Sequence, residues 1–569
     1  MNLKNLINAG LGGTKVDLVL KNARVIDVAS HNIFITDVAI NEGIVVGFGD
    51  YQAKEAIDLR GKYLAPGFIE AHIHLESSKL TPDEFCRVII PKGTTTIVCD
   101  PHEIANVHGL AGINYILRAG KYMPINIFVM VPSSVPATKL ETSGAMIDAG
   151  IISELNRRKC VIGLAEMMDY AGVLSGEMEI IKKIDVAKYH RVDGHAPGLT
   201  GKRLCAYITA GIYSDHECTT KDEGAEKLRD GMYIMARAAS SAKNLSQLLS
   251  LVTPENSRRF MLIRDDVDPY DLKKQGDLNY LLKQAVSLGI DPITAVQMVT
   301  INPGDYFNFK KIGLIAPGYC ADLVVLSDIN DFRVESVFKD GRLCAQAGEL
   351  IDNIQAPKDN SLPRNSINIK INSLSGLKVP VEGESLKVIG LIPDQIVTNK
   401  LIVEPKIINN EVVADIKRDI LKIAVVERHH ASGNIGVGFI RGMGLKSGAI
   451  ASSIAHDSHN IIVVGTNDVD MKKAVLEIIK IRGGQVVVRH DQVVSSLSLP
   501  IAGLLSDKKV DDVIKEDMEV IKAAQALGSN LSNPFMTLSF LALPVVPMLK
   551  ITDKGLVDVD KLTIVPLMS

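Results

Sequence analysis

The sequence predicts an α/β protein built around a (β/α)8 TIM-like barrel, which is inserted in a small β-sandwich domain and followed by a C-terminal α+β domain. Between about residues 66 and 310, short apolar runs alternate with longer helical patterns, as in βα units around a parallel sheet. Short β-type runs flank this region on both sides, and Ala-Pro-Gly triplets at 65–67 and 316–318 bracket it. A polar stretch then leads into a second region of mixed helices and strands.

Composition excludes several other classes of protein. The 569 residues are 46% apolar and 23% charged, which is ordinary for a globular chain. With 63 Lys and Arg against 66 Asp and Glu, the net charge of −3 does not favour a nucleic-acid partner. The seven cysteines form no CxxC pair, which favours reduced thiols and a cytoplasmic location. The most apolar late stretch, 535–549, is interrupted by two prolines and is too short to span a membrane.

The β-type runs on both sides of the barrel region are rich in β-branched residues and are separated by Asn, Gly and Asp. They lie at 15–20, 23–29, 36–49, 55–59, 311–326 and 335–343. Because both groups border the barrel region, we expect residues 1–65 and 311–350 to pair in one composite β domain.

The barrel itself is expected over residues 66–310. Eight candidate strands lie at 67–74, 94–100, 126–133, 161–167, 189–196, 210–217, 232–238 and 260–266. Their number and length match a (β/α)8 barrel. A linker is expected at 351–370, and a C-terminal α+β domain at 371–569. Two clear helical patterns within it, 470–482 and 511–527, stop before glycines, as helix C-termini commonly do.

Chemistry-bearing side chains gather at the ends of the predicted strands. His72 and His74 are two residues apart, so on a strand both imidazoles point to one face. Four further strands end in Glu166, His195, His216 and Asp265. The carboxyl ends of barrel strands meet at one mouth, so these six side chains should converge. Imidazole and carboxylate together suit Zn, Fe, Mn or Ni, and six ligands are enough for two divalent ions.

Longer motifs make a family resemblance plain. PGFIEAHIHLES, the Asp of the eighth strand and APGYCADLVVL resemble the amidohydrolase superfamily. The runs CDPHEIANVHG, GLAEMMD, DGHAPG, SDHE and GFIRGMGLKSGAIASSIAHDSHNIIVVG resemble, more closely, the bacterial adenine deaminase family. The resemblance covers nearly the whole chain, including a C-terminal domain that most amidohydrolases lack.

The resemblance implies a binuclear metal site. One ion would be held by His72, His74 and Asp265, and the other by His195 and His216. Glu166 would bridge them, where many relatives use a carboxylated lysine; GLAEMMD contains no lysine. The family is associated with Mn²⁺ or Fe²⁺, although ligand type alone also admits Zn²⁺. A homodimer or higher homo-oligomer is likewise implied.

The implied reaction is the hydrolytic deamination of adenine to hypoxanthine and ammonia, in purine salvage or catabolism, by a metal-bound hydroxide that attacks C6. Asp265 would take the hydroxide proton and help to deliver a proton to the leaving amine. The same ions and the same Asp would also serve another amidohydrolase, such as an N-acetylamino-sugar deacetylase or a cyclic-amide hydrolase, because only the pocket discriminates between these substrates.

Attack on the ring also requires that a ring nitrogen be protonated. The segment after the second strand supplies the candidates: Glu103 as a second catalytic residue, with Asp100 and His102 as substrate contacts. Asp100 followed by a proline also fits the cap of a helix. Ser133, after the third strand, is a further candidate hydrogen-bond donor to the substrate.

Two further expectations concern the surroundings of the site. Strand alternation predicts that Glu217, directly after His216, turns away from the metal. The alternative is that Glu217 orients a ligand imidazole. In the C-terminal domain, His429, His456 and His459 are candidates for a cover over the barrel mouth that excludes water and contacts the purine. The alternatives for His456 and His459 are a separate metal site and an ordinary loop between two strands.

Overall fold

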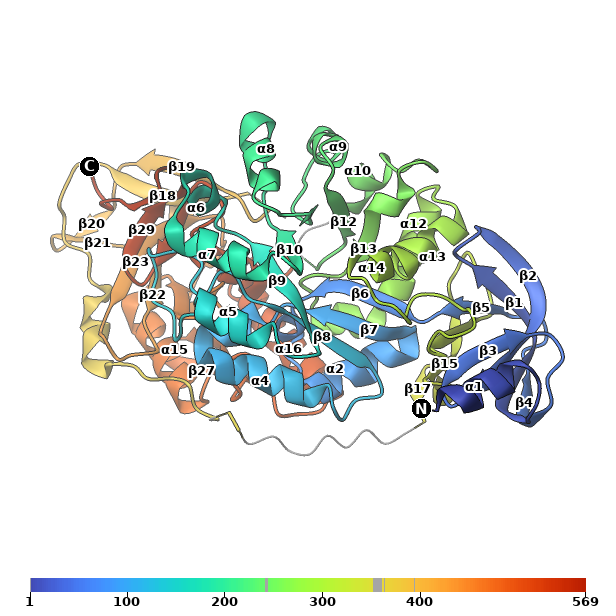
Figure 1. Ribbon diagram of the computed structural model, residues 1–569. Helices are drawn as coiled ribbons and strands as arrows, with labels where there is room; N and C mark the ends of the chain where they lie inside the picture. Colours follow the sequence, from blue (N-terminus) through green and yellow to red (C-terminus); the bar gives the residue numbers. More distant parts are fainter. Residues whose placement is uncertain (1, 241–243, 352–360, 363, 393–394) are drawn as a thin grey trace.

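The computed structural model describes residues 2–240, 244–351, 361–362, 364–392 and 395–569. It places the composite β sheet at one end of the molecule, the barrel in the middle and the C-terminal region at the other end (Figure 1). The fold class predicted from the sequence is confirmed: a barrel of parallel strands and helices is inserted between β segments and followed by an α+β region.

The two chain segments that flank the barrel share one sheet, in which nine strands lie within the described residues. β5 (Tyr63–Pro66), directly before the barrel, pairs antiparallel with β14 (Leu323–Leu326), which follows it. The other strands are β1 Val16–Asp27, β2 Asn32–Asn41, β3 Ile44–Phe48, β4 Ala53–Asp58, β15 Val334–Lys339, β16 Arg342–Gln346 and β17 Glu349–Leu350. Side chains of both segments, such as Val25 and Phe338, are buried in one core, so the barrel interrupts a single β unit.

In the described part of the chain, eight parallel strands form the barrel as two arcs, ordered β10-β9-β8-β7-β6 and β11-β12-β13. The strands are β6 Phe68–Ile73, β7 Thr94–Cys99, β8 Asn126–Val131, β9 Val161–Met167, β10 Arg191–Gly194, β11 Ser214–Asp215, β12 Tyr233–Arg237 and β13 Phe260–Ile263. Backbone hydrogen bonds join the arcs at both seams. Tyr213 N donates to Val192 O over 3.1 Å, and Asp265 N donates to His72 O over 3.3 Å.

Helices follow the barrel strands and cover their outer faces. They are α2 Pro82–Ile89, α3 His102–His108, α4 Leu110–Ala119, α5 Ala149–Leu155, α6 Tyr170–Ser175, α7 Met178–Ala187, α8 Gly201–Thr209, α9 Lys221–Arg229, α10 Leu245–Leu249, α11 Pro269–Lys274, α12 Leu278–Ser287, α13 Pro292–Met298 and α14 Ile301–Tyr306. Several begin at capping side chains: Asp148 accepts from Ile151 N before α5, and Thr220 accepts from Glu223 N before α9. No helix in the described ranges combines the length and the apolar character that crossing a bilayer requires.

The C-terminal region is built on a mixed sheet ordered β19-β18-β23-β22-β25-β24-β26-β27. Its strands are β18 Leu386–Leu391, β19 Thr398–Val403, β22 Ile420–Val426, β23 Ile435–Arg441, β24 Ala449–Ser452, β25 Ile461–Gly465, β26 Gly484–Arg489 and β27 Gln492–Ser498. The two predicted helices are present as α15 (Asp468–Lys480) and α16 (Val510–Ala526). Within the predicted linker, residues 352–360 and 363 lie outside the described residues.

The C-terminal region packs directly on the barrel. Thr142, in the loop after β8, donates to Asp553 through its backbone N (2.9 Å) and its Oγ1 (2.6 Å). Buried Lys79, after β6, donates to Asp517 of α16 over 2.6 Å. These contacts position the C-terminal region over the barrel loops that follow the carboxyl ends of the strands.

Candidate metal centre and active site

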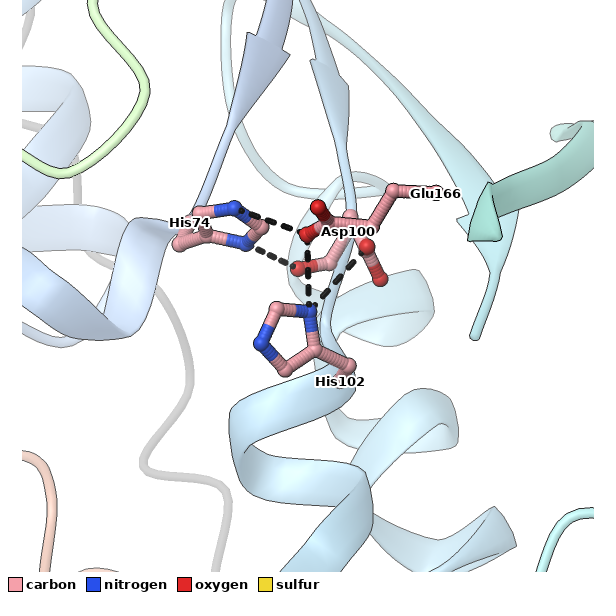
Figure 2. A group of neighbouring side chains, drawn as sticks. All are labelled: His74, Asp100, His102 and Glu166. Carbon is pink, nitrogen blue, oxygen red and sulfur yellow. Dashed lines mark hydrogen bonds and ion pairs between the residues drawn. The ribbon is translucent and has the colours of Figure 1, made fainter. Parts of the chain in front are cut away.

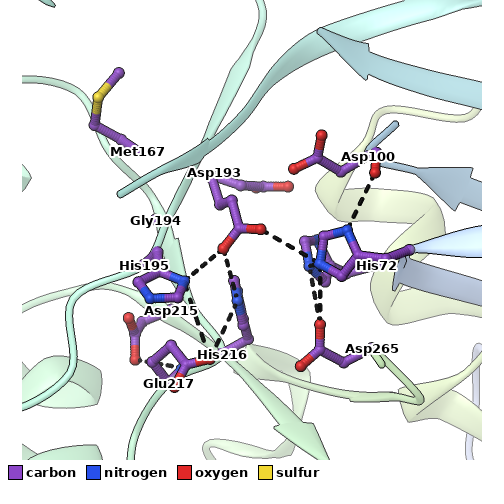
Figure 3. A network of polar contacts seen from close by, with 12 residues as sticks. His72, Asp100, Met167, Asp193, Gly194, His195, Asp215, His216, Glu217 and Asp265 are labelled. Atoms are coloured by element: carbon purple, nitrogen blue, oxygen red, sulfur yellow. Dashed lines mark hydrogen bonds and ion pairs between the residues drawn. The ribbon is translucent and has the colours of Figure 1, made fainter. Parts of the chain in front are cut away.

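The six side chains predicted to hold metal come together, and all are buried. Two of them lie within strands, His72 in β6 and Glu166 in β9. The others lie one or two residues beyond a strand end: His74, His195, His216 and Asp265. Figure 3 shows His72, His195 and His216 near one another, with Asp265 beside His72. The rings of His72 and His216 stack with centroids 4.3 Å apart, which joins the two predicted ligand groups.

The first group is a triangle of donor atoms. His72 Nε2 and His74 Nε2 are 3.1 Å apart, and Asp265 Oδ1 lies 3.4 Å and 3.2 Å from them, respectively. On the opposite side of its ring, His74 Nδ1 lies 3.1 Å from the backbone oxygen of Asp100 (Figure 2). A carbonyl only accepts, so Nδ1 carries the proton and the lone pair of His74 Nε2 faces the triangle.

The second group is organised around Glu166. His195 Nδ1 lies 2.5 Å and His216 Nε2 lies 3.0 Å from Glu166 Oε2. The other oxygen, Oε1, lies 3.3 Å from His74 Nε2 in the first group. The two oxygens of one carboxylate are therefore divided between the two groups of histidines.

This donor set fits divalent cations. Two ligands about 2.1 Å from one ion and at right angles to each other lie about 3.0 Å apart, close to the 3.1–3.4 Å separations of the triangle. The orientation of His74 by a backbone carbonyl is the usual support of a metal-binding imidazole. The two groups thus fit divalent cations, and Glu166 lies close to both groups.

Both carboxylates are held in the ionised form that binds cations. Burial alone would raise the pKa of Glu166, but His216 and His195 hold it well below its usual range. Burial would likewise raise the pKa of Asp265, and the guanidinium of Arg237 holds it well below its usual range.

Sequence reasoning missed Arg237 and misplaced Glu217. Arg237 ends β12, and its Nη1 lies 2.5 Å from both Asp265 Oδ2 and Glu217 Oε1. The prediction that Glu217 turns away is wrong: its Oε1 is 3.7 Å from His216 Nε2, and it lines the cavity. β11 is only two residues long, so strand alternation does not extend to Glu217. The missed signal was a charged side chain at the end of an otherwise apolar strand, as at the other site positions.

The segment after β7 contributes His102 and Glu103, which both line the cavity. Asp100 does not cap α3, because its Oδ2 lies 3.1 Å from His102 Nδ1 instead. His102 Nδ1 also lies 3.5 Å from Glu166 Oε1, as Figure 2 shows. Ser133 is not among the cavity-lining residues; its Oγ donates to the backbone oxygen of Glu166 over 2.5 Å.

The C-terminal region covers the barrel mouth and closes the cavity on that side. Its contribution to the lining is Ile396, His456, Asp457, Phe540 and Leu543. His456 and Asp457 belong to the loop between the adjacent strands β24 and β25. His429 does not line the cavity, because its Nε2 bonds to the backbone oxygen of Ser458 over 2.7 Å.

The two parts of the chain that line this cavity are each similar to a known protein family. The amidohydrolase family matches residues 63–344, and the adenine deaminase C-terminal domain matches residues 395–563. The chain is 47% identical over 565 residues to adenine deaminase 2 of Carboxydothermus hydrogenoformans, with 99% of each chain covered. The chain belongs to the adenine deaminase family. An adenine deaminase of Methanothrix thermoacetophila is 44% identical over 571 residues, which cover 100% of both chains.

The two matched segments divide the cavity in a simple way. The amidohydrolase match contains all six candidate ligands and implies a divalent metal. The match to the adenine deaminase C-terminal domain contains every lining residue that comes from the C-terminal region. The C-terminal wall of the cavity therefore lies within the match to the adenine deaminase C-terminal domain, and the rest of its lining lies within the amidohydrolase match.

Proposed function

We propose that this protein hydrolyses adenine to hypoxanthine and ammonia in the cavity between the barrel mouth and the C-terminal region. The observation that carries the proposal is the full-length similarity to adenine deaminases, 47% identity over 99% of both chains, in a chain that gathers all six candidate ligands. Asp265 and Glu103, which line the cavity, are the carboxyl groups that this reaction needs for proton transfer.

The residues that would hold two cations form two groups, one for each ion. One ion would lie among His72, His74 and Asp265, and the other between His195 and His216, with Glu166 shared. Imidazole nitrogen and carboxylate oxygen, without thiolate, suit Mn²⁺, Fe²⁺ or Zn²⁺. The family resemblance favours Mn²⁺ or Fe²⁺ among them. When bound, two such cations lower the pKa of a water molecule and supply hydroxide at neutral pH.

Asp265 is the group that moves protons at the reacting carbon. Arg237 keeps it ionised and fixes one of its oxygens, so that it accepts a proton from the attacking water. The same carboxyl group then gives that proton to the exocyclic nitrogen, which leaves as ammonia. The second proton carrier is Glu103, which reaches the cavity from α3. Its carboxylate would take up the proton released when water becomes hydroxide and deliver it to a ring nitrogen.

The remaining lining residues bind and enclose the purine. His102, oriented by Asp100, offers a hydrogen bond to the ring edge. Met168, Ile396, Phe540 and Leu543 form an apolar wall. This wall suits the flat face of a purine and excludes bulk water, which strengthens the electrostatic contacts in the cavity.

The test is the release of ammonia and hypoxanthine from adenine by purified protein, as the apo form and after loading with Mn²⁺, Fe²⁺ or Zn²⁺. We expect metal-dependent turnover that is lost in Glu166→Gln and kept in Glu179→Gln, which makes the same change on an exposed helix surface. No turnover of adenine by protein that binds two ions per chain would overturn the substrate assignment. Turnover of an N-acetylamino sugar or a cyclic amide by that protein would identify the alternative.

A further inference from the structure

The carboxylate of Glu103 is held by two histidines that belong to the C-terminal region. His456 Nδ1 lies 2.7 Å from Glu103 Oε1, and His459 Nε2 contacts Glu103 Oε2. All three residues are at most 4% exposed. Each oxygen of Glu103 therefore has one partner from a segment that lies more than 350 positions away in the chain.

We propose that His456 and His459 are positioning residues, which orient the Glu103 carboxylate so that its remaining lone pairs face the substrate cavity. This inference rests on the proposed function, in which Glu103 protonates the purine ring. It makes the C-terminal region a necessary part of the catalytic machinery in addition to a cover.

The contacts of His459 determine which of its nitrogens donates. The backbone N of Ala455 donates to His459 Nδ1 over 3.2 Å, so Nδ1 must be the acceptor. Burial lowers the pKa of His459 to about 4, and the ring is therefore neutral with its proton on Nε2. That proton points at Glu103 Oε2 and fixes this oxygen.

His456 is held by contacts on other sides of the residue. Its ring stacks on Phe540, with centroids 4.5 Å apart and planes at 22°. Its backbone N donates to Ser539 O over 3.1 Å. These contacts fix the ring plane, and with it the direction from Nδ1 to Glu103 Oε1.

The loop that carries both histidines is too firmly braced to follow Glu103 if the carboxylate moves. Arg428, which is fully buried, bonds through Nε to the backbone oxygen of His459 and donates from Nη2 to Ala502 O over 2.9 Å. Asn460 accepts from Arg428 N over 3.1 Å and donates to Thr142 O of the barrel over 2.8 Å. The loop is thus tied to both domains, and it sets the position of Glu103.

The barrel supplies much less support to the same carboxylate. Among the described residues, its closest charged or ring partner from the barrel is His102, whose Nε2 lies 3.4 Å from Oε1 and whose Nδ1 is used by Asp100. Glu103 stands in the first turn of α3, where a free side chain has several rotamers. Without the two histidines, its orientation would be largely unspecified.

Two substitutions of each histidine separate positioning from a general loss of structure. His459→Ala and His456→Ala remove the donor, whereas His459→Gln and His456→Asn each keep an amide N–H near the position of the lost ring nitrogen. We expect the Ala variants to lower kcat on adenine about 10–100-fold, with KM changed less than about threefold and two ions per chain retained. The Gln and Asn variants should recover most of that loss.

A double-mutant cycle tests whether the histidines act through Glu103. In a Glu103→Ala background, His459→Ala should lower kcat by less than about twofold further, because its target is gone. His430→Ala is the matched control: His430 also bonds across the domains, to Ser143 O over 2.9 Å, and does not contact Glu103. Its kcat should stay near that of the unmodified protein.

Three results would overturn the inference: unchanged kcat in both Ala variants, additive losses in the cycle, or a third ion per chain that is lost with His456 or His459. Crystal structures of His459→Ala and His459→Gln add a readout that does not depend on turnover. Glu103 should rotate in the first and stay in the second. If the unmodified, metal-loaded protein does not deaminate adenine, the proposed function fails, and these two structures still decide whether the histidines position Glu103.

Discussion

Arg237 is the most informative single position to change, because it holds two buried carboxylates at once. Its Nη1 lies 2.5 Å from Asp265 Oδ2 and 2.5 Å from Glu217 Oε1, and its Nη2 donates to Glu217 over 2.7 Å. Arg237→Met keeps much of the side-chain volume and removes the charge and every donor. Arg237→Lys keeps the charge but offers one nitrogen where the guanidinium offers three.

The expected loss follows from this geometry. Removing one partner of a buried ion pair costs about 3–5 kcal/mol, because the other charge is left without compensation. At about 2–4 °C per kcal/mol for a domain of this size, the melting midpoint of the metal-free Met variant should fall on the order of 10 °C. Because Asp265 is also a candidate ligand, metal affinity or kcat/KM should fall about 10–100-fold in the Met variant and less in the Lys variant.

Calorimetry with and without metal, metal titration and adenine turnover measure these losses separately. The control is Lys339→Met, which also removes a cation from between two carboxylates, those of Asp322 and Asp340, but in the composite β domain. It should lower stability and leave turnover unchanged. Normal metal affinity and normal turnover in Arg237→Met would refute the role assigned to the arginine.

Three further predictions concern the cations, Ser133 and Glu141. Chelation should abolish adenine turnover and lower the melting midpoint, and two ions per chain should restore both; identical melting with and without metal would contradict the fit of the site. Ser133→Ala should cost about 0.5–1.5 kcal/mol, the value of its bond to the Glu166 carbonyl, and should keep kcat/KM within about tenfold; a loss as large as that of Glu166→Gln would place Ser133 against the substrate. Burial and then the charge of Asp457 raise the pKa of Glu141 from 4.5 to about 8. The folded state therefore binds an extra proton in this window, and the stability that Glu141 contributes below pH 4.5 is lost as the pH rises to about 8. In Glu141→Gln, the melting midpoint should depend less on pH over that window than it does in the unmodified protein. The same pH dependence in both proteins would contradict this prediction.

The barrel side of the cavity could be predicted from the sequence, because short local patterns mark the ends of its strands. An apolar run followed by a histidine or a carboxylate marks a strand end, and parallel strands bring their ends to one mouth. His72, Glu166 and Asp265 could be singled out in this way, and the structure brings their side chains together. Glu217 was misplaced because the length of β11 depends on its neighbours in the barrel and not on its own residue pattern.

The apolar part of the C-terminal wall could not be predicted, because no local pattern encodes it. His456, in contrast, was among the residues expected to cover the barrel mouth, and it lines the cavity. Phe540 and Ile396 are ordinary apolar residues in sequence, and they line the cavity only because the C-terminal region docks on the barrel. That docking depends on pairs such as Thr142 with Asp553, which lie 411 positions apart. His456 and His459 were noticed as a cluster, but their partner Glu103 becomes evident only when both domains are placed.

The charges of the cavity show why this arrangement calls for cations. Among the described residues, six carboxylates line it: Glu103, Glu166, Glu217, Asp265, Asp266 and Asp457. The permanent positive charge among the lining residues is Arg237. Burial lowers the pKa of His456, but Glu103 more than offsets this and raises it to about 9, so His456 adds a second positive charge at neutral pH. Two divalent cations together with Arg237 and His456 would balance six carboxylates. Without the cations, protonated histidines supply part of the positive charge: burial lowers the pKa of His216, but Glu166 more than offsets this and raises it to about 9. The carboxylates proposed to perform the chemistry and the cations that the family implies would therefore stabilise one another.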